Sequence, residues 1–246
     1  MVCRAIIVIA LVLLACSLVT DHSWSQSFPD SPPMDEGMIA MQSGRFDDAV
    51  EIFSQLIAVA PTAEAYFQRG LAYSALKKPR LALADLNQAV SKDPNNPSYR
   101  VERGQMLLAT AHFDNAVEDF TAALRADPGN VAALVGRAQS FINLRRDERA
   151  LGDLNEAIRH SPDNGLLYRL RGDALSRAGL HEEAVKAYDR AIALRPSDAV
   201  AHNNRGTALA NLGKNREAIE DFNRAMDVAI STPSQVEIPG LTGNAW

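Results

Sequence analysis

The stretch PSYRVERGQMLLATAHFDNAVEDFTAALRADP, residues 97–128, contains the pattern that decides the fold. Before the closing Pro128 come, in order, a glycine (Gly104), an alanine (Ala116) and a large aromatic residue (Phe120). The same residue types recur at the same distances before other prolines of the chain. A fixed period of this kind is the signature of a repeat architecture.

The pattern repeats at nearly constant intervals over most of the chain. The prolines that close the units are Pro61, Pro94, Pro128, Pro162 and Pro196, and a sixth copy has Ile230 in the place of the proline. The recurring small residues are Gly37, Gly70, Gly104, Ala138, Gly172 and Gly206; the alanines are Ala49, Ala82, Ala116, Ala150, Ala184 and Ala218; the large residues are Phe53, Leu86, Phe120, Leu154, Tyr188 and Phe222.

Each recurring residue has a mechanical role in a pair of helices. Small side chains let two helices approach closely, and the large residue fills the space between neighbouring pairs. Proline lacks the backbone donor and clashes with the preceding turn, so it ends each unit. Gly44, Gly179 and Gly213 predict the turn inside a pair, where a left-handed conformation is often needed. We expect Asn95, Asn130, Asp163 and Asp198 to cap the helices that follow the prolines.

With these features, the sequence resembles the tetratricopeptide repeat family, whose unit of about 34 residues is a helix–turn–helix. The resemblance implies an all-α fold, a right-handed α-solenoid of about six helix pairs over residues 30–230. The position where the family favours Trp departs from the pattern, since it holds Arg100 and His202 in two repeats and Pro33 in the first. The expected repeats are residues 30–62, 63–96, 97–130, 131–164, 165–198 and 199–230.

The N-terminal residues differ in composition from the rest of the chain. Residues 5–19 are an almost unbroken apolar stretch, which is short for a membrane span but suits a signal peptide. We expect residues 1–25 to be a signal peptide cleaved after Ser25, with Ser27 as the second choice of site. We expect the protein to be exported, either periplasmic or secreted. Two alternatives stay open, an uncleaved anchor and a lipoprotein acylated at Cys16. Cleavage after Ser25 would remove both cysteines, Cys3 and Cys16.

Composition and motifs exclude several functions. The net charge is −5, with 25 basic and 30 acidic residues, which argues against a nucleic-acid partner. No phosphate-binding loop, hydrolase elbow or zinc-protease motif is present in the sequence. The histidines His112, His160, His181 and His202 fall at different repeat positions, so they predict no metal site. We therefore expect no catalysis, no cofactor and no membrane span in the mature chain.

Arginine and aspartate also recur with the period, and we interpret them as ion pairs between repeats. The series are Arg69, Arg103, Arg137, Arg171 and Arg205, and Asp85, Asp119, Asp153 and Asp221, with Ala187 as the exception. Because the first helix of each pair packs on the second helix of the preceding pair, we expect Asp85 to meet Arg103, Asp119 to meet Arg137 and Asp153 to meet Arg171. Arg205 would then lack its partner. The alternative interpretation is a charged track for a ligand.

The resemblance also implies a ligand groove lined by the first helix of each pair. The residues at these positions are Met34, Met38, Met41, Phe67, Leu71, Gln105, Gln139, Arg169, Asp173, Arg177, Asn203 and Asn211. The groove would be apolar and rich in methionine at one end, which suits a peptide or helix, and polar at the other. The methionines could equally be core packing near the mature N-terminus. The Lys and Asn pair with which some family members clamp a carboxylate is missing, since Phe67 and Leu71 occupy those positions.

The leading hypothesis is a non-enzymatic adaptor of the cell envelope that binds a protein or peptide segment in this groove. One alternative is a scaffold that forms homo-oligomers through its end, and another is an accessory subunit of an envelope enzyme or secretion complex. Residues 231–246 contain Pro233, Pro239 and Gly240, so we expect a non-helical tail. We expect its apolar residues to lie as a partly ordered, extended strip over the last helix pair. The alternative is a disordered tail with exposed apolar residues.

Overall fold

The computed structural model describes residues 34–231, and these form twelve helices and no strand. The predicted signal peptide, Cys16 and the tail after Ser231 lie outside the described residues. None of the described helices is long and apolar enough to cross a membrane. The helices are α2 (Met34–Gln42), α3 (Phe46–Val59), α4 (Ala63–Ala75), α5 (Pro79–Lys92), α6 (Pro97–Ala109), α7 (Phe113–Ala126), α8 (Val131–Asn143), α9 (Asp147–His160), α10 (Gly165–Arg177), α11 (His181–Leu194), α12 (Ala199–Asn211) and α13 (Asn215–Ser231).

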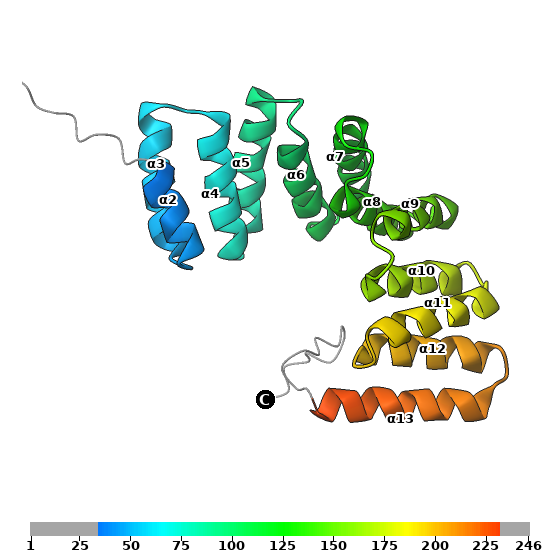
Figure 1. Ribbon diagram of the computed structural model, residues 1–246. Coiled ribbons are helices and arrows are strands. Elements are labelled where there is room, and N and C mark those ends of the chain that lie inside the picture. The colour runs from blue at the N-terminus through cyan, green and yellow to red at the C-terminus, as the bar shows by residue number, and fades with distance from the viewer. Residues whose placement is uncertain (1–33, 232–246) are drawn as a thin grey trace, which may run out of the picture.

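The helices form six antiparallel pairs that stack into an all-α solenoid, as the repeat pattern predicts. Each even-numbered helix packs on the odd-numbered helix that follows it, and from α4 onward also on the one that precedes it. Figure 1 shows the pairs following one another along a curved path from α2 to α13. Even-numbered helices also contact each other across repeats (α2 with α4, α6 with α8, α10 with α12), so they form the inner side of the curve.

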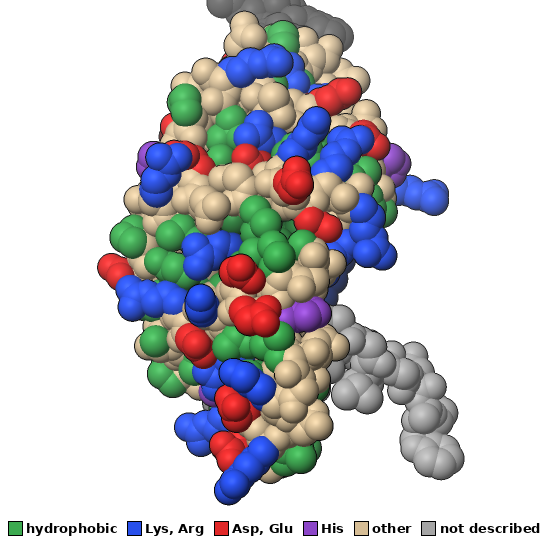
Figure 2. All heavy atoms as spheres, turned by 90° about the vertical axis from the view of Figure 1, so that its right-hand side faces the viewer, with side chains coloured by type: hydrophobic (Ala, Val, Ile, Leu, Met, Phe, Trp, Pro, Cys, Tyr) green, Lys and Arg blue, Asp and Glu red, His purple; other side chains and the backbone are tan. Residues whose placement is uncertain are grey.

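The surface on the right-hand side of Figure 1 carries side chains of both charges, with basic side chains gathered toward the upper right of the view in Figure 2. Basic and acidic side chains are interspersed over this face (Figure 2). Such mixing agrees with the near balance of 25 basic and 30 acidic residues.

Asn, Asp and Thr side chains cap the inner helices. Asn130 and Asp198 accept hydrogen bonds from the backbone N–H groups of Ala133 and Ala201, as predicted. The predictions for Asn95 and Asp163 are wrong by one residue, because Asn96 and Asn164 are the caps. The residue directly before the first helical residue has the extended backbone that brings its side chain onto the free N–H groups. Thr62 caps α4 in the same way.

The turn inside each pair requires a left-handed residue. Gly44, Gly179 and Gly213 have φ angles of 70°, 79° and 77°, as predicted. The other three pairs place Lys77, Ala111 and Arg145 in the same conformation, with φ angles of 56°, 61° and 60°. These three side chains are exposed, so they do not clash with the core. The left-handed conformation of a residue with a side chain does introduce backbone strain at these three turns.

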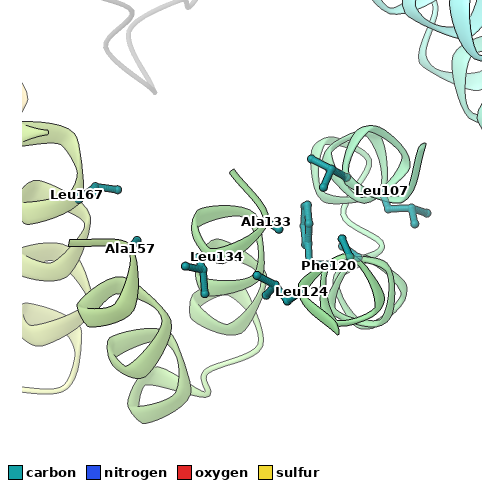
Figure 3. Close-up of a cluster of buried hydrophobic side chains, with 10 residues drawn as sticks. Leu107, Phe120, Leu124, Ala133, Leu134, Ala157 and Leu167 are labelled. Carbon is teal, nitrogen blue, oxygen red and sulfur yellow. The ribbon is translucent and has the colours of Figure 1, made fainter. Parts of the chain in front are cut away.

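The centre of the core is Phe120, whose ring is fully buried between two inner helices (Figure 3). A Cβ atom on Gly104 of α6 would lie 2.8 Å from the ring, and one on Gly136 of α8 would lie 2.3 Å from it. The absence of a side chain at Gly136 lets α8 approach Phe120 and α6 closely. Accordingly α6 and α8 contact each other more extensively than other inner helices do. Leu124, Leu134 and Leu167 continue this cluster toward the next repeats.

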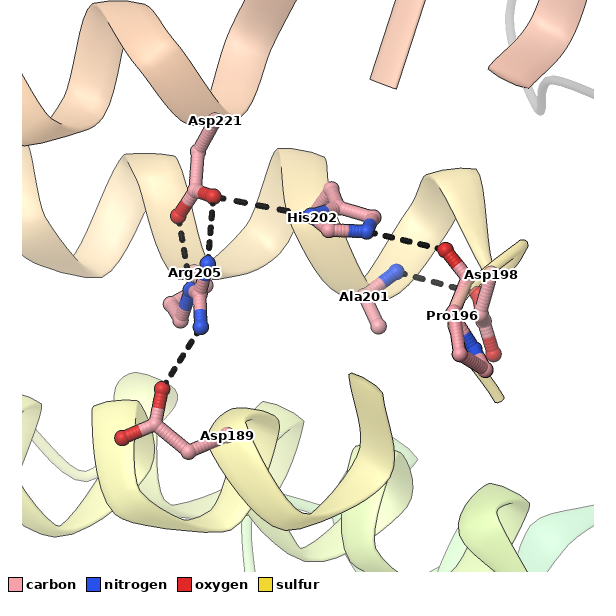
Figure 4. Close-up of polar contacts among 7 residues, drawn as sticks. All are labelled: Asp189, Pro196, Asp198, Ala201, His202, Arg205 and Asp221. Atoms are coloured by element: carbon pink, nitrogen blue, oxygen red, sulfur yellow. Dashed lines mark hydrogen bonds and ion pairs between the residues drawn. The ribbon is translucent and has the colours of Figure 1, made fainter. Parts of the chain in front are cut away.

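The periodic arginines pair within their own repeat, so the predicted partners are wrong. The side chains of Arg69, Arg103, Arg137 and Arg205 donate two hydrogen bonds each to the aspartate 16 residues later, at 2.6–2.8 Å. The bond to Asp85 raises the pKa of Arg69. Arg205 is therefore not the arginine without a partner; Figure 4 shows it bound to Asp221 and Asp189.

Each of these arginines also reaches the preceding repeat. Arg103 donates to Asn87 at 3.1 Å, Arg137 to Thr121 at 3.2 Å and Arg205 to Asp189 at 2.7 Å. One guanidinium thus joins both helices of its own pair to the outer helix of the pair before. This arrangement supports the interpretation that the series fixes the stacking of repeats, although through different contacts from those predicted.

Arg171 is the arginine that lacks an aspartate, because Ala187 occupies the equivalent position in its repeat. Its Nε atom is buried without a hydrogen-bond partner in the described residues, and its Nη1 reaches Asn155 only at 3.5 Å. Ala187→Asp would place a carboxylate where the other repeats have one. We expect this substitution to raise the free energy of unfolding by about 1 kcal/mol, because a charge-assisted bond replaces an unsatisfied donor.

Urea denaturation monitored by circular dichroism measures this change. Ala187→Asn is the matched control, since it has nearly the same shape and no charge, and we expect a smaller gain from it. A loss of stability in Ala187→Asp would contradict the assignment of Arg171 as the unpaired member of the series.

Candidate functional site

The predicted groove residues all lie on the inner helices, but they differ in how accessible they are. Met34, Met38 and Met41 of α2 are half-buried and pack on the cluster formed by Ala40 and Phe53 with its neighbours. Their side chains thus contribute to the core of the first repeat. The packing interpretation of the methionines is supported, and only their outer portions remain open to a ligand.

Phe67 is buried, with 9% of its surface exposed, so little of its side chain is accessible to a ligand. Its ring lies 4.6 Å from the ring of Tyr99, measured between centroids, across the boundary of the second and third repeats. The Tyr99 hydroxyl donates to Glu64 at 2.7 Å, and Gln68 donates to the same carboxylate at 2.6 Å. Burial, followed by the bond to Glu64, raises the pKa of Tyr99 to about 12. Phe67 therefore supports the floor of the inner face and is mostly shielded from a ligand.

Leu71 and Gln105 line a cavity of about 230 Å³ between α4 and α6. Its floor is Leu86 of α5, and Met106 and Ala109 form an apolar wall. Glu102 of α6 supplies the one charged group of the lining. Burial raises the pKa of Glu102 above the usual value for a carboxylic acid.

Asp173 and Arg177 line a second cavity, of about 220 Å³, between α10 and α12. Asp173 accepts hydrogen bonds from the Tyr188 hydroxyl at 2.9 Å and from the Asn204 amide at 2.8 Å. Burial raises the pKa of Asp173 although these two bonds favour its charged form. Burial and the nearby Asp173 carboxylate raise the pKa of Tyr188 as well. The cavity is polar, and its polar groups already bind each other.

The remaining predicted residues are spread along the inner face. Arg169 is half-buried between Asp173 and Asp198, at 3.5 and 3.4 Å. Arg177 donates to the backbone oxygen of Ile142 at 2.9 Å. The other three, which are Gln139, Asn203 and Asn211, are half-exposed or exposed, and none of them lines either cavity.

A third cavity, larger than these two, lies on the outer side. It has about 510 Å³ and is lined by residues of α7, α8 and α9, among them Thr121, Arg137 and Glu156. Gly152 of α9 has no side chain to fill this space. On the inner side α6 and α8 lie close together, whereas the outer helices α7 and α9 are separated by the cavity. The Arg137–Asp153 pair at its edge belongs to the stacking series.

The described residues contain no group of His, Cys, Asp and Glu side chains that could hold a metal ion. His202 is buried, and its ring contacts Asp221 at 3.5 Å and the backbone oxygen of Pro196 at 3.1 Å (Figure 4). Arg100 and Tyr168, at the same repeat position, donate to the backbone oxygens of Pro94 and Pro162. The residues that replace the expected Trp therefore tie the loops between repeats.

Tetratricopeptide repeat sequence models match residues 34–97 and 101–165, more than half of the chain, and further repeat models match residues 172–213 and 199–229. The chain belongs to the tetratricopeptide repeat family. A comparison with curated proteins gives no match.

Solved structures of tetratricopeptide repeat proteins have the same fold. MamA residues 41 to the end from Desulfovibrio magneticus RS-1 is 22% identical, with a TM-score of 0.65 over 70% of this chain and 97% of that one. YrrB, described as a TPR protein with an unusual peptide-binding site, is 22% identical, with a TM-score of 0.60 over 76% of this chain and 95% of that one. The C-terminal part of a TPR repeat-containing protein from Cytophaga hutchinsonii is 17% identical, with a TM-score of 0.68, over 81% and 80%.

Two residues that define the cavities were missed by the sequence analysis of this tetratricopeptide repeat protein. Asn204 and Glu102 occupy the same repeat position, one turn before Thr207 and the predicted groove residue Gln105, and each projects toward the preceding inner helix. The signal that could have found them is a separation of 31 residues, which joins Asn204 to Asp173. The same separation relates Glu102 to Leu71.

Proposed function

We propose that the protein is a non-enzymatic adaptor that binds a protein segment on the inner face of the solenoid. The observation that supports this function best is the pair of cavities between inner helices, one apolar with a single carboxylate and one polar. They lie at equivalent places of the repeat array, three repeats apart, and both open between inner helices. Binding of protein or peptide partners by tetratricopeptide repeat proteins supports the same role.

A peptide selection tests this function directly. Residues 26–246, which contain every described helix, would be used to select binders from a displayed library of random peptides. We expect Gln105→Trp and Thr207→Trp to weaken the selected peptides at least about tenfold, because each indole would fill an inner cavity. Gln88→Trp on the outer helix α5 is the control, since Gln88 is exposed away from both cavities. Equal weakening by the control, or no selected peptide, would refute the inner-face assignment.

The proposed location is outside the cytoplasm, because of the apolar residues 5–19 and the small residues that follow them. A phosphatase that is active only after export, fused behind residue 33, tests this location, and an inactive fusion would contradict it. Acylation of Cys16 is the alternative form of attachment. Fatty-acid labelling that disappears in Cys16→Ser would identify it.

A self-associating scaffold is the second candidate, and exposed apolar side chains on α13, the last described helix, favour it. Ile219, Met226 and Ile230 are 59%, 58% and 78% exposed. The residues equivalent to Ile219 and Met226 in the preceding repeat, Val185 and Ile192, are half-buried beneath the next helix pair. Sedimentation of Met226→Glu beside the unchanged chain distinguishes the two functions: a dimer abolished by the substitution supports the scaffold, and a monomer in both argues against it.

A further inference from the structure

The two inner cavities are equivalent positions of the repeat with different chemistry. Each residue of the α10–α12 cavity named here lies three repeats after its counterpart in the α4–α6 cavity. Asp173 corresponds to Leu71, Tyr188 to Leu86, and Asn204 to Glu102. The difference between the cavities therefore comes from side chains and not from the backbone arrangement.

In the α10–α12 cavity the carboxylate is bound by its neighbours. Asn204 and Tyr188 both donate to Asp173, at 2.8 and 2.9 Å. In the α4–α6 cavity the carboxylate, Glu102, lies on the second inner helix, α6, at the position of Asn204. The positions of Asp173 and Tyr188 are occupied there by Leu71 and Leu86. Neither leucine can donate a hydrogen bond. Within residues 34–231 the Glu102 carboxylate has no hydrogen-bond or ion-pair partner, and Ser74 and Gln105 are the polar neighbours in the cavity lining.

An unpartnered, half-buried carboxylate in a mostly apolar cavity is unfavourable for the free protein. Burial removes part of its hydration without compensation, and this is the cause of the raised pKa of Glu102. The cavity would be more stable with an apolar residue at this position. Side chains that violate a packing rule without a compensating contact are typical of functional sites.

The surrounding inner face supplies no positive charge to Glu102. The arginines of α4 and α6 are Arg69, Arg100 and Arg103, and all three bind Asp85 or Asp119 of the outer helices. No lysine occurs in α2, α4 or α6, whereas Asp35 and Glu36 of α2 are acidic, as is Glu64 of α4, which Gln68 and Tyr99 already bind. Apart from these three paired arginines, the charged residues of the first three inner helices are therefore all acidic.

We infer that the cavity between α4 and α6 binds a Lys or Arg side chain of the partner segment, with its aliphatic stem against Leu71, Leu86 and Met106 and its cationic end on Glu102. This inference rests on the proposed function and specifies the chemistry of the partner. Long basic side chains combine an apolar stem with a charged tip, which is the combination that the cavity lining offers. Residues 26–33 and 232–246 of this chain contain no Lys or Arg, so neither segment is the occupant.

The test compares peptides selected on residues 26–246, each synthesised with its Lys intact and with Lys replaced by norleucine, which keeps the stem and lacks the ammonium. We expect the replacement to weaken binding at least about tenfold on the unchanged chain and less than about twofold on Glu102→Gln. Glu118→Gln on the outer helix α7 is the matched control, and it should behave as the unchanged chain does.

A second variant gives Glu102 a hydrogen-bond donor from the protein itself. Leu71→Asn would place an amide 31 residues before Glu102, in the relation that joins Asn204 to Asp173. We expect it to weaken the Lys peptide and to leave the norleucine peptide unchanged. Because Glu102→Gln removes an unpartnered charge, its melting temperature should be equal or higher, which separates binding from folding.

The outcomes distinguish the two levels of the proposal. Selected peptides that respond to Gln105→Trp but contain no enriched Lys or Arg would overturn the basic side-chain site and leave the adaptor function standing. If replacing Lys by norleucine weakened binding equally on Glu102→Gln and on the unchanged chain, the basic side-chain site would also be overturned and the adaptor function would stand. Peptides insensitive to all inner-face substitutions would instead refute the adaptor function.

Discussion

Asp119→Ala is expected to lower the free energy of unfolding by about 3–5 kcal/mol. Asp119 is 1% exposed and accepts hydrogen bonds from Arg100 at 2.8 Å and from Arg103 at 2.6 Å. Removing the carboxylate leaves two guanidinium groups largely shielded from water and without their shared counter-charge. Urea denaturation of residues 26–246 measures the loss.

Asp114→Ala is the matched control for this prediction. Asp114 lies on the same helix and pairs with Arg146 at 3.2 Å, but both side chains are largely exposed. We expect a change of less than about 1 kcal/mol, because water and salt screen such a pair. If Asp119→Ala weakened partner binding and left stability unchanged, the arginine–aspartate series would have to be a ligand track and not a stacking device.

Phe120→Ala is expected to cost about 3–5 kcal/mol, through lost burial and the cavity that remains. The ring lies between Gly104 of the third repeat and Gly136 of the fourth. Its removal therefore leaves a cavity in the core of the third repeat and also removes a contact that joins the third repeat to the fourth. In a solenoid, stability is close to a sum of repeat and interface contributions. We therefore expect hydrogen exchange to accelerate in α6, α7 and α8 together, with smaller changes in α2 and α13.

The matched control is Phe222→Ala, at the equivalent position of the last repeat. Phe222 packs on Gly206, where a Cβ atom would lie 2.9 Å from the ring, but it is only half-buried because no described helix pair follows α13. We expect a smaller loss, about 1–2 kcal/mol. Equal losses in the two variants would contradict the role of the ring in coupling successive repeats.

Much of the fold could be predicted because its determinants act locally. Proline ends a helix through its own ring, glycine permits the left-handed turn, and Asn130 caps the helix that begins directly after it. The caps at Asn96 and Asn164 were misplaced by one residue because an adjacent Asn or Asp competes in the sequence. The backbone conformation before the helix decides between the two neighbours.

The candidate site was predicted only in outline. The inner position of residues such as Leu71, Gln105 and Asp173 follows from the repeat pattern, and the structure places all three at cavities. The pattern did not reveal that Phe67 is buried against Tyr99. It also did not reveal Glu102, because a single glutamate on an amphipathic helix looks like an ordinary solvated residue.

By itself, the sequence determined the number of repeats, the succession of helix pairs and the identity of the inner helices. These follow from the regular spacing of small, large and proline residues, because the sizes of Gly, Ala and Phe and the ring of proline set the length of each unit. Tertiary structure alone decided which groups are partnered. Arg103 lies nearly midway in the sequence between Asp85 and Asp119, and the period fits either pairing equally well. The crossing of the two helices within a pair brings Arg103 to Asp119 and not to Asp85. The crossing of α4 and α6 places Glu102 beside Leu71, where it has no partner among the described residues. Contacts between helices depend on their relative orientation and not on spacing along the chain.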